Sequence, residues 1–178
     1  QTVRVKPDGI RVYPTVVLKD TALAKSYAQG LYEPWSLDEA VKVGARWLGI
    51  FSYYRIPVIR MGLQATENLR TDHDLLAGPY HPAYRELVES RLMLDQLIEA
   101  ISRIKDKNDG VRIIFNYRDY SKVIGHKKVN HDTIKAFFPS TVLEFYPDKF
   151  MPKNDIRLEF DDGGFCLTRQ EFLEKYRI

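Results

Sequence analysis

Three polar side chains at the ends of two apolar runs have the chemistry of a binding site. Lys19 and Thr21 follow the run 11–18, and Gln64 follows the run 56–63. Binding residues in α/β sheets gather where strands end, so we expect these three side chains at one sheet edge. A lysine there can hold a carboxylate or phosphate, while a hydroxyl and an amide can hydrogen-bond a ribose or a base edge. A solvated strand end, with Thr21 capping a helix, is the alternative.

Two arginines lie within the same two runs. Because successive side chains of a strand point to opposite faces, Arg60 can lie across the sheet from Lys19 or from Arg11. We therefore include Arg11 and Arg60 among the candidate binding residues.

A metal site is a weaker interpretation of the loop that follows. Asp72, His73, Asp74 and His81 offer two carboxylates and two imidazoles, which are metal ligands. Their spacing matches no compact binding template, and a histidine before a proline can simply anchor a loop. We predict no metal site there.

A basic segment in the second half of the chain is a candidate nucleic-acid contact. Its candidate residues are Arg118, Lys122, His126, Lys127 and Lys128. The sequence Val-Ile-Gly-His-Lys-Lys resembles the KH module, whose Gly-x-x-Gly loop clamps single-stranded nucleic acid, although Lys128 replaces the second glycine. A solvated helix face is the alternative.

Cysteine usage and composition limit the function classes. The only cysteine, Cys166, is expected to be a buried structural thiol, and one cysteine cannot hold an iron–sulfur cluster, which takes about four ligands. The 178 residues are 44% apolar and 29% charged, which fits a soluble globular protein. No apolar run approaches the ~20 residues that span a bilayer, so we expect no membrane contact and a cytoplasmic location. The net charge of +3 neither requires nor excludes nucleic acid.

The first half of the chain predicts a strand–helix–strand crossover. The runs 2–6 and 9–18 are separated by the turn signal Pro7-Asp8-Gly9, which predicts either two short strands or one turn that leads into a main strand over 11–18. A short helix is expected after Thr21. Ser36 and Glu39 form a capping box before an apolar helix, and a parallel strand follows over 56–63. A polar loop over 67–80 then leads to a long helix over 84–105.

The pattern changes after Gly110. A strand over 111–117, helical sequence over 121–138, strands over 141–146 and 155–160, and a terminal helix over 168–176 predict a β-α-β-β-α unit. We therefore expect two domains, 1–105 and 110–178.

Several blocks of the first half resemble one known family. The run from Arg11 to Leu23, with Gly30-Leu-Tyr-Glu-Pro34, resembles the last strand of the radical S-adenosylmethionine (SAM) barrel in relatives of the Elongator catalytic subunit. Blocks 56–66 and 77–83 extend the resemblance. It is closest to a bacterial branch labelled oxygen-independent coproporphyrinogen oxidase-like or histone acetyltransferase, although the sequence shows no acetyl-CoA-binding pattern.

The resemblance implies an α/β fold: the C-terminal strands and helices of a partial radical SAM (β/α) barrel, followed by a small α+β module. It also implies a parent enzyme with a [4Fe–4S] cluster and SAM that acts on transfer RNA. The resemblance further places Lys19, Thr21, Gln64, Arg11 and Arg60 near SAM or the substrate.

The Cys-x3-Cys-x2-Cys cluster motif of that family is absent from the chain. We therefore expect a C-terminal part that is inactive alone, whose partner is the N-terminal half of the same protein. A homodimer through the open barrel edge is also expected. The alternatives are a non-enzymatic RNA- or protein-binding module and a small regulatory subunit.

Overall fold

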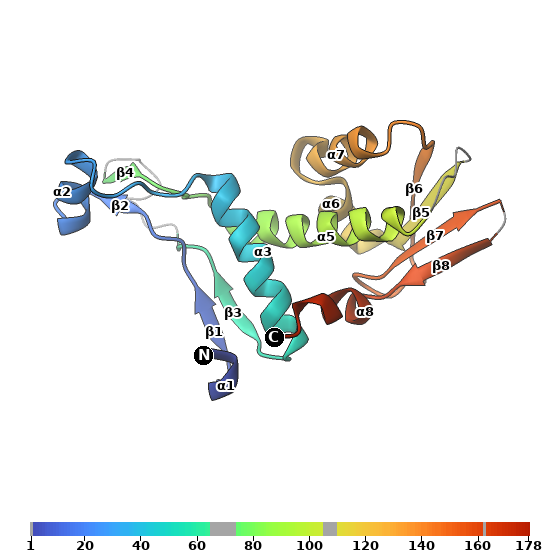
Figure 1. Cartoon of the computed structure of the whole chain (residues 1–178), viewed down its shortest axis with the longest axis horizontal. Helices are drawn as coiled ribbons and strands as arrows, with labels where there is room; N and C mark the ends of the chain where they lie inside the picture. Colours follow the sequence, from blue (N-terminus) through green and yellow to red (C-terminus); the bar gives the residue numbers. More distant parts are fainter. Residues whose placement is uncertain (1, 65–73, 105–109, 162) are drawn as a thin grey trace. The chain divides into compact units, whose positions relative to one another are not determined.

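The computed structural model describes residues 2–64, 74–104, 110–161 and 163–178 (Figure 1). The chain divides into two compact units, Gln1–Val88 and Glu89–Ile178, and the division falls within helix α5 (Tyr84–Ser102). The fold is mixed α/β, with small sheets, none of which is closed among the described residues. No helix in the described ranges has the length and apolarity needed to cross a membrane.

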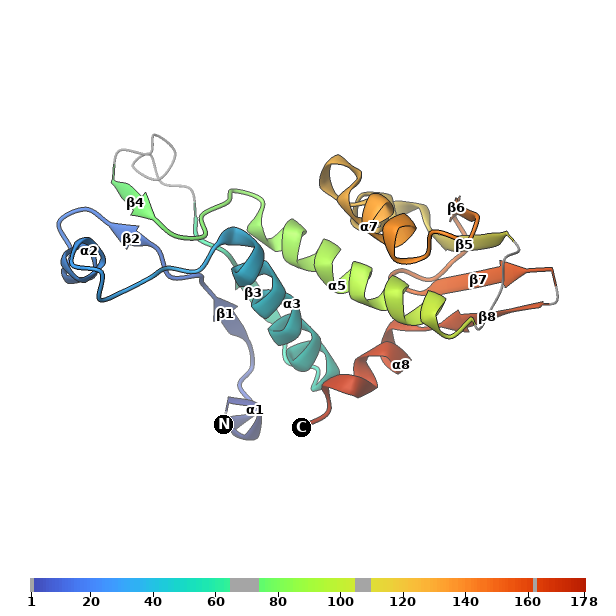
Figure 2. The same cartoon turned by 45° about the horizontal axis from the view of Figure 1, so that its top comes forward.

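A strand–helix–strand unit forms the centre of the first unit. Strand β1 (Ile10–Val12) pairs in parallel with β3 (Val58–Met61), and helix α3 (Leu37–Tyr53) lies between them in sequence (Figure 2). The capping box is present: the Glu39 N–H donates to Ser36 Oγ at 3.3 Å, and the Ser36 N–H donates to the Glu39 carboxylate at 2.8 Å. The helix start and the parallel pairing predicted from the sequence are therefore confirmed.

The single strand expected over 11–18 is wrong, because the structure divides it in two. Strand β2 (Val17–Leu18) leaves the β1–β3 pair and joins β4 (Leu75–Ala77) in an antiparallel ladder. Pro14 lies at the break; it has no N–H to donate to a ladder and its φ is fixed. The loop expected over 67–80 thus contains strand β4, and its residues 67–73 lie outside the described ranges.

Of the two alternatives for the start of the chain, the one with a short strand over 2–6 is wrong. Residues Thr2–Val5 form a short helix, α1, and none of its side chains is buried. β-branched residues favour strands mainly when they pack on a pleated, half-buried surface, and this segment has none. Helix α2 (Ala22–Ala28) begins after Thr21, as predicted.

The second unit contains a four-stranded sheet in the order β6-β5-β7-β8. Strand β5 (Val111–Asn116) is parallel to β6 (Leu143–Asp148) and antiparallel to β7 (Ile156–Phe160). Strand β8 (Gly163–Leu167) pairs with β7 as a hairpin, so the predicted β-α-β-β-α order lacked one strand.

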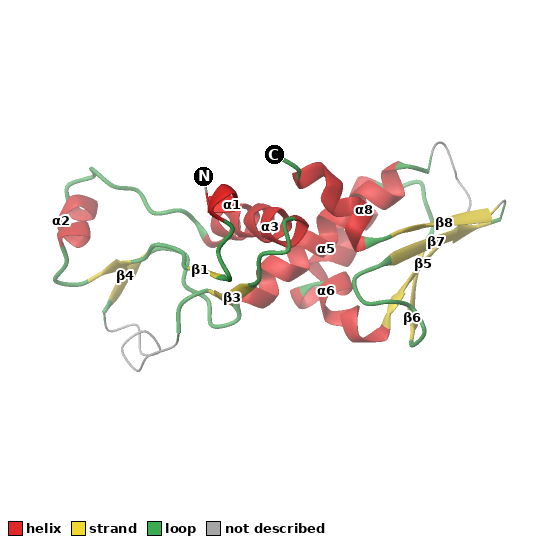
Figure 3. Cartoon of the chain, turned by 90° about the horizontal axis from the view of Figure 1, so that it is seen from below, coloured by secondary structure: helices red, strands yellow, loops and turns green. Residues whose placement is uncertain are grey.

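The helices of the second unit gather on one side of this sheet (Figure 3). They are the C-terminal part of α5, together with α6 (Tyr120–Ile124), α7 (Val129–Phe137) and α8 (Arg169–Leu173). Alternate strand residues face them and are buried: Val111, Ile113, Phe115, Leu143, Ile156, Leu158 and Leu167. The residues between these positions form what we call the outer face: Arg112, Ile114, Glu144, Tyr146, Arg157, Glu159 and Cys166.

Candidate functional site

Two arginines and a glutamine lie together on the exposed face of the β1–β3 pair. Arg11 and Arg60 are direct partners in the parallel register, and the Arg60 guanidinium donates to the Gln64 side-chain oxygen at 3.1 Å. All three residues are exposed, whereas the next residues along each strand, Val12 and Met61, are buried. Strand alternation thus separates a cationic face from a core face.

This arrangement suits an anionic ligand. Two adjacent guanidinium groups repel each other, and an anion placed between them would offset that repulsion. A guanidinium binds carboxylate or phosphate through paired N–H donors, and the Gln64 amide nitrogen remains able to donate to a hydroxyl. The Arg11–Arg60–Gln64 face is therefore the candidate site of the first unit.

Lys19 and Thr21 follow strand β2, at the end of the other ladder of the first unit. The Lys19 N–H donates to the Asp74 carbonyl at 2.8 Å, at the end of the β2–β4 pair. The Thr21 hydroxyl donates to the Leu18 carbonyl at 2.7 Å and accepts the Ala24 N–H at 3.1 Å, so it caps α2. No hydrogen bond or ion pair between described residues links either one to Gln64.

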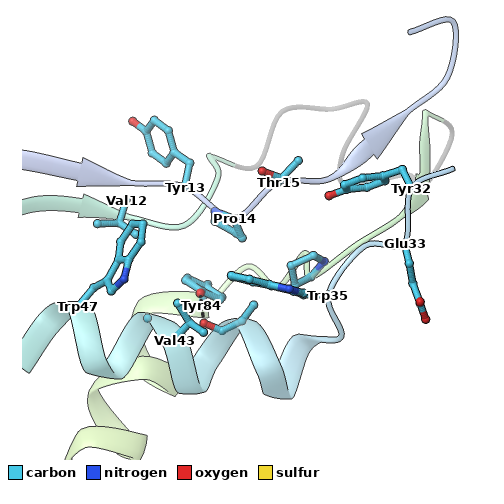
Figure 4. Close-up of a pocket in the computed structure, with 13 residues that line it drawn as sticks. Val12, Tyr13, Pro14, Thr15, Tyr32, Glu33, Trp35, Val43, Trp47 and Tyr84 are labelled. Atoms are coloured by element: carbon cyan, nitrogen blue, oxygen red, sulfur yellow. Dashed lines mark hydrogen bonds between the residues drawn. The ribbon is translucent and has the colours of Figure 1, made fainter. Parts of the chain in front are cut away.

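An aromatic cleft on the other side of β1 was not anticipated from the sequence. It has a volume of about 370 Å³. Figure 4 shows Trp47 between β1 and α3, and Trp35 between α3 and the segment of Pro14 and Thr15 that follows β1. Figure 4 also shows the Tyr13 side chain on the opposite side of the strand. Trp47 lies outside the buried stripe of α3 and is 47% exposed, and a tryptophan in that position was the available sequence signal.

Tyr84 fixes the floor of this cleft. Its hydroxyl donates to the Ala40 carbonyl at 2.7 Å, and burial raises the pKa of the phenol. The cleft can accommodate a flat apolar group. The Tyr84 hydroxyl already donates its hydrogen to Ala40, so it is not free to donate to such a ligand. The cleft lies on the core side of β1, so it is distinct from the Arg11–Arg60–Gln64 face.

The basic segment of the second unit is partly engaged in ion pairs. Lys122 contacts Glu89 at 3.0 Å and Asp119 at 3.7 Å, while the Arg118 guanidinium donates to the Tyr117 hydroxyl at 2.8 Å. His126, Lys127 and Lys128 are exposed, in the loop between α6 and α7. These last three residues are therefore better placed than Lys122 to contact an external phosphate.

Left-handed backbone shapes this loop. Lys127 and Lys128 have φ values of 50° and 65°, and Gly125 has a φ of 79°. A Cβ on Gly125 would lie 2.8 Å from the Asn130 nitrogen, so only glycine fits. The buried Asn130 amide donates to Ser90 and to the Lys122 carbonyl, which fixes the start of α7.

Cys166 is exposed, so the expectation of a buried thiol is wrong. Partial desolvation of the sulfur, with the nearby carboxylates of Asp155 and Glu171, raises the pKa of the thiol. A protonated thiol is a poor nucleophile and a poor metal ligand. With this one cysteine in the sequence, the residues of the chain do not fit a [4Fe–4S] cluster.

The described part of the chain also contains no cluster of His, Cys, Asp and Glu suited to a metal ion. Of the loop residues considered as ligands, Asp72 and His73 lie outside the described ranges. The His81 ring nitrogen accepts the Ala83 N–H at 3.1 Å, which fits the loop-anchor interpretation.

Comparison with known proteins gives one result for the first half of the chain. Residues 7–93, nearly half of the chain, match the family model described as the Radical_SAM C-terminal domain. The comparisons with curated proteins and with solved structures find no match. The matched range contains the Arg11–Arg60–Gln64 face, Lys19, Thr21 and the aromatic cleft.

Proposed function

Because residues 7–93 are a Radical_SAM C-terminal domain, we propose that this chain supplies the C-terminal part of a radical SAM, iron–sulfur enzyme of the Elongator-like type. In that proposal, strands β1 and β3 complete one edge of a partial barrel, and the substrate is a transfer RNA. The family implies SAM and an iron–sulfur cluster. The cluster ligands would come from the N-terminal half of the same protein, so this chain is expected to be inactive alone.

The observation that carries the proposal is the pairing of Arg11 with Arg60 on an exposed strand face beside Gln64. We propose that the two guanidinium groups hold the carboxylate of SAM or a phosphate of the substrate, and that Gln64 contacts a hydroxyl. Lys19 would approach the ligand from the neighbouring β2–β4 ladder. Thr21 is assigned to the helix cap, because both hydrogen-bonding functions of its hydroxyl are used there.

A binding titration tests this role. SAM is titrated into the isotope-labelled chain, and amide chemical shifts around β1 and β3 are followed by NMR. Arg60→Gln is expected to weaken binding about tenfold, since charge-assisted hydrogen bonds contribute roughly 1.5–3 kcal/mol. Arg46→Gln is the matched control, because Arg46 is an exposed arginine on α3.

Equal weakening by both substitutions, or no shifts in the β1–β3 region, would refute the assignment. A separate measurement covers the expected inactivity: the isolated chain should neither cleave SAM nor bind iron stoichiometrically. Cleavage by the chain alone would contradict that expectation.

A second candidate function is RNA binding by the loop of the second unit. The exposed residues His126, Lys127 and Lys128 precede α7, whose first residue has no side-chain cap, so N–H groups and ammonium groups lie together. Lys127→Glu with Lys128→Glu should reduce RNA affinity and flatten its salt dependence. Lys6→Glu with Lys25→Glu, the same charge change on exposed residues of the first unit, is the control.

The strand edges suggest a partner for the first unit. β1 and β3 pair only with each other among the described residues, so each has an outer edge. We propose that the N-terminal half of the same protein adds strands there, or that a second copy does. Sedimentation velocity of the chain distinguishes a monomer from a dimer.

A further inference from the structure

We infer that the outer face of the second-unit sheet is a binding surface for single-stranded nucleic acid, with bases stacked on Tyr146 and on the neighbouring rings. The inference is independent of the proposed role of residues 7–93. It also shares no residue with the basic loop 125–128.

Among the described residues of the second unit, the helices lie on the other side of the sheet, and Ile114 is the one outer-face residue that is buried. A hollow of about 610 Å³ lies on the outer face. Six of its lining residues matter for the argument: Arg112, Tyr117, Tyr146, Lys149, Phe150 and Arg157. Tyr146 is 54% exposed and Phe150 is 83% exposed, values that leave both rings available to a ligand.

A cationic side chain lies close to each of three aromatic rings at this hollow. The Arg112 guanidinium lies 5.3 Å from the centre of the Tyr146 ring, and the Lys149 ammonium lies 4.9 Å from that of Phe150. Beside them, the Arg118 guanidinium lies 5.4 Å from the Tyr117 ring. Single-stranded nucleic acids bind where aromatic faces stack bases and nearby cations contact the backbone. Open four-stranded sheets with exposed aromatic residues bind RNA in this way.

Two cations remain available for a polyanion after the ion pairs of the outer face are counted. Glu159 contacts Arg157 at 3.2 Å and Arg112 at 3.9 Å, and Glu144 contacts Arg112 at 3.6 Å, so these charges offset one another. The Asp148 carboxylate accepts the Phe150 N–H at 2.8 Å. Lys149, which lines the hollow, and Arg118, beside it on the Tyr117 ring, have no carboxylate partner within the described ranges, so both can contact phosphates.

Cys166 offers a direct reporter of occupancy. It is exposed and is the register partner of Arg157, so it lies on the same face, and the sequence has no other cysteine. A nucleic acid that covers the outer face should slow alkylation of this thiol by a maleimide.

The experiment uses the full chain with fluorescent mixed-sequence RNA and DNA single strands, and the same RNA as a duplex. Tyr146→Ala is expected to weaken single-strand binding about tenfold, as loss of one stacked base does, and Tyr146→Phe to restore it. Tyr27→Ala, an exposed tyrosine on α2, is the control and should leave affinity unchanged. The duplex should bind more weakly, and bound single strands should slow Cys166 alkylation.

Binding of RNA, DNA or both with these effects supports the proposal, and the preferred strand identifies the ligand. The proposal is overturned if neither strand binds, or if they bind with Tyr146→Ala and Cys166 unaffected. Loss of affinity only in the Lys127→Glu, Lys128→Glu variant would place binding on the basic loop instead. A concentration-dependent dimer that is lost in Tyr146→Ala would show that a protein surface occupies the face.

Discussion

Arg11 and Arg60 are direct partners in the parallel β1–β3 register, so two guanidinium groups occupy adjacent positions on one exposed face. Like charges placed directly opposite each other on a sheet destabilise it. The pair is therefore expected to reduce the stability of the chain by itself, and in the proposed role an anion between the two side chains would offset that repulsion.

Removing one of these charges should stabilise the isolated chain. Arg11→Gln is expected to raise the free energy of unfolding by about 0.5 kcal/mol at low salt, and by less at high salt because ions screen exposed charges. Urea denaturation at two salt concentrations measures the change. Arg46→Gln, which changes an exposed arginine on α3, should have little effect. A destabilising Arg11→Gln would show that the two charges do not repel each other.

The capping box at Ser36 predicts a dependence of stability on acid pH. Hydrogen bonds from Ser36 lower the pKa of Glu39. A carboxyl group with a lower pKa in the folded chain stabilises the fold above its unfolded pKa, and this contribution is lost as pH falls through the folded value. Thermal melting from neutral to acid pH should therefore show a gap between the wild type and Glu39→Ala that closes in acid. Glu33→Ala, an exposed glutamate outside the helix, is the control; a pH-independent gap would contradict the assignment.

Gly125 should not tolerate alanine. Its φ is 79°, and an added Cβ would lie 2.8 Å from the Asn130 backbone nitrogen. Left-handed backbone costs a residue with a Cβ roughly 1–2 kcal/mol, and the clash adds to that cost. Gly125→Ala should therefore lower the free energy of unfolding by about 2 kcal/mol or more, measured in urea.

Gly110 provides the matched control for that substitution. A Cβ added there meets no atom within 4 Å, and its φ is not left-handed. Gly110→Ala should change stability by less than about 0.5 kcal/mol. If Gly125→Ala and Gly110→Ala lowered the free energy of unfolding equally, the backbone around Gly125 would have shifted to accommodate the added Cβ.

The hydrogen bonds of the Asn130 side-chain amide should contribute measurably to the stability of the second unit. The amide donates to the Ser90 carbonyl at 3.0 Å and to the Lys122 carbonyl at 2.8 Å. Asn130→Ala leaves these acceptors without their donor and should cost about 1–3 kcal/mol, measured by chemical denaturation. Thr133→Ala on the same helix is the control. If Asn130→Ala lowered the free energy of unfolding by less than Thr133→Ala does, water would have replaced the amide as hydrogen-bond donor.

Local sequence signals determined where several helices start. Thr21 and Ser36 each cap a helix as predicted, because a cap involves groups only three residues apart, and Thr168 caps α8 in the same way. The parallel β1–β3 pairing also followed from the order of strand, helix and strand. Strand alternation left two possible partners for Arg60, Lys19 and Arg11, and the structure pairs it with Arg11.

Tertiary structure decided which strands pair and which faces are buried, because both depend on residues far apart in the chain. β2 pairs with β4, a strand about sixty residues later in the chain, and not with β3, so Lys19 and Gln64 follow strands of different ladders. Lys122 is held by Glu89, and which face of β5 the helices cover follows from packing across the whole second unit. A sequence read alone shows which side chains alternate along a strand, but burial of one face depends on the free energy of packing against elements far along the chain.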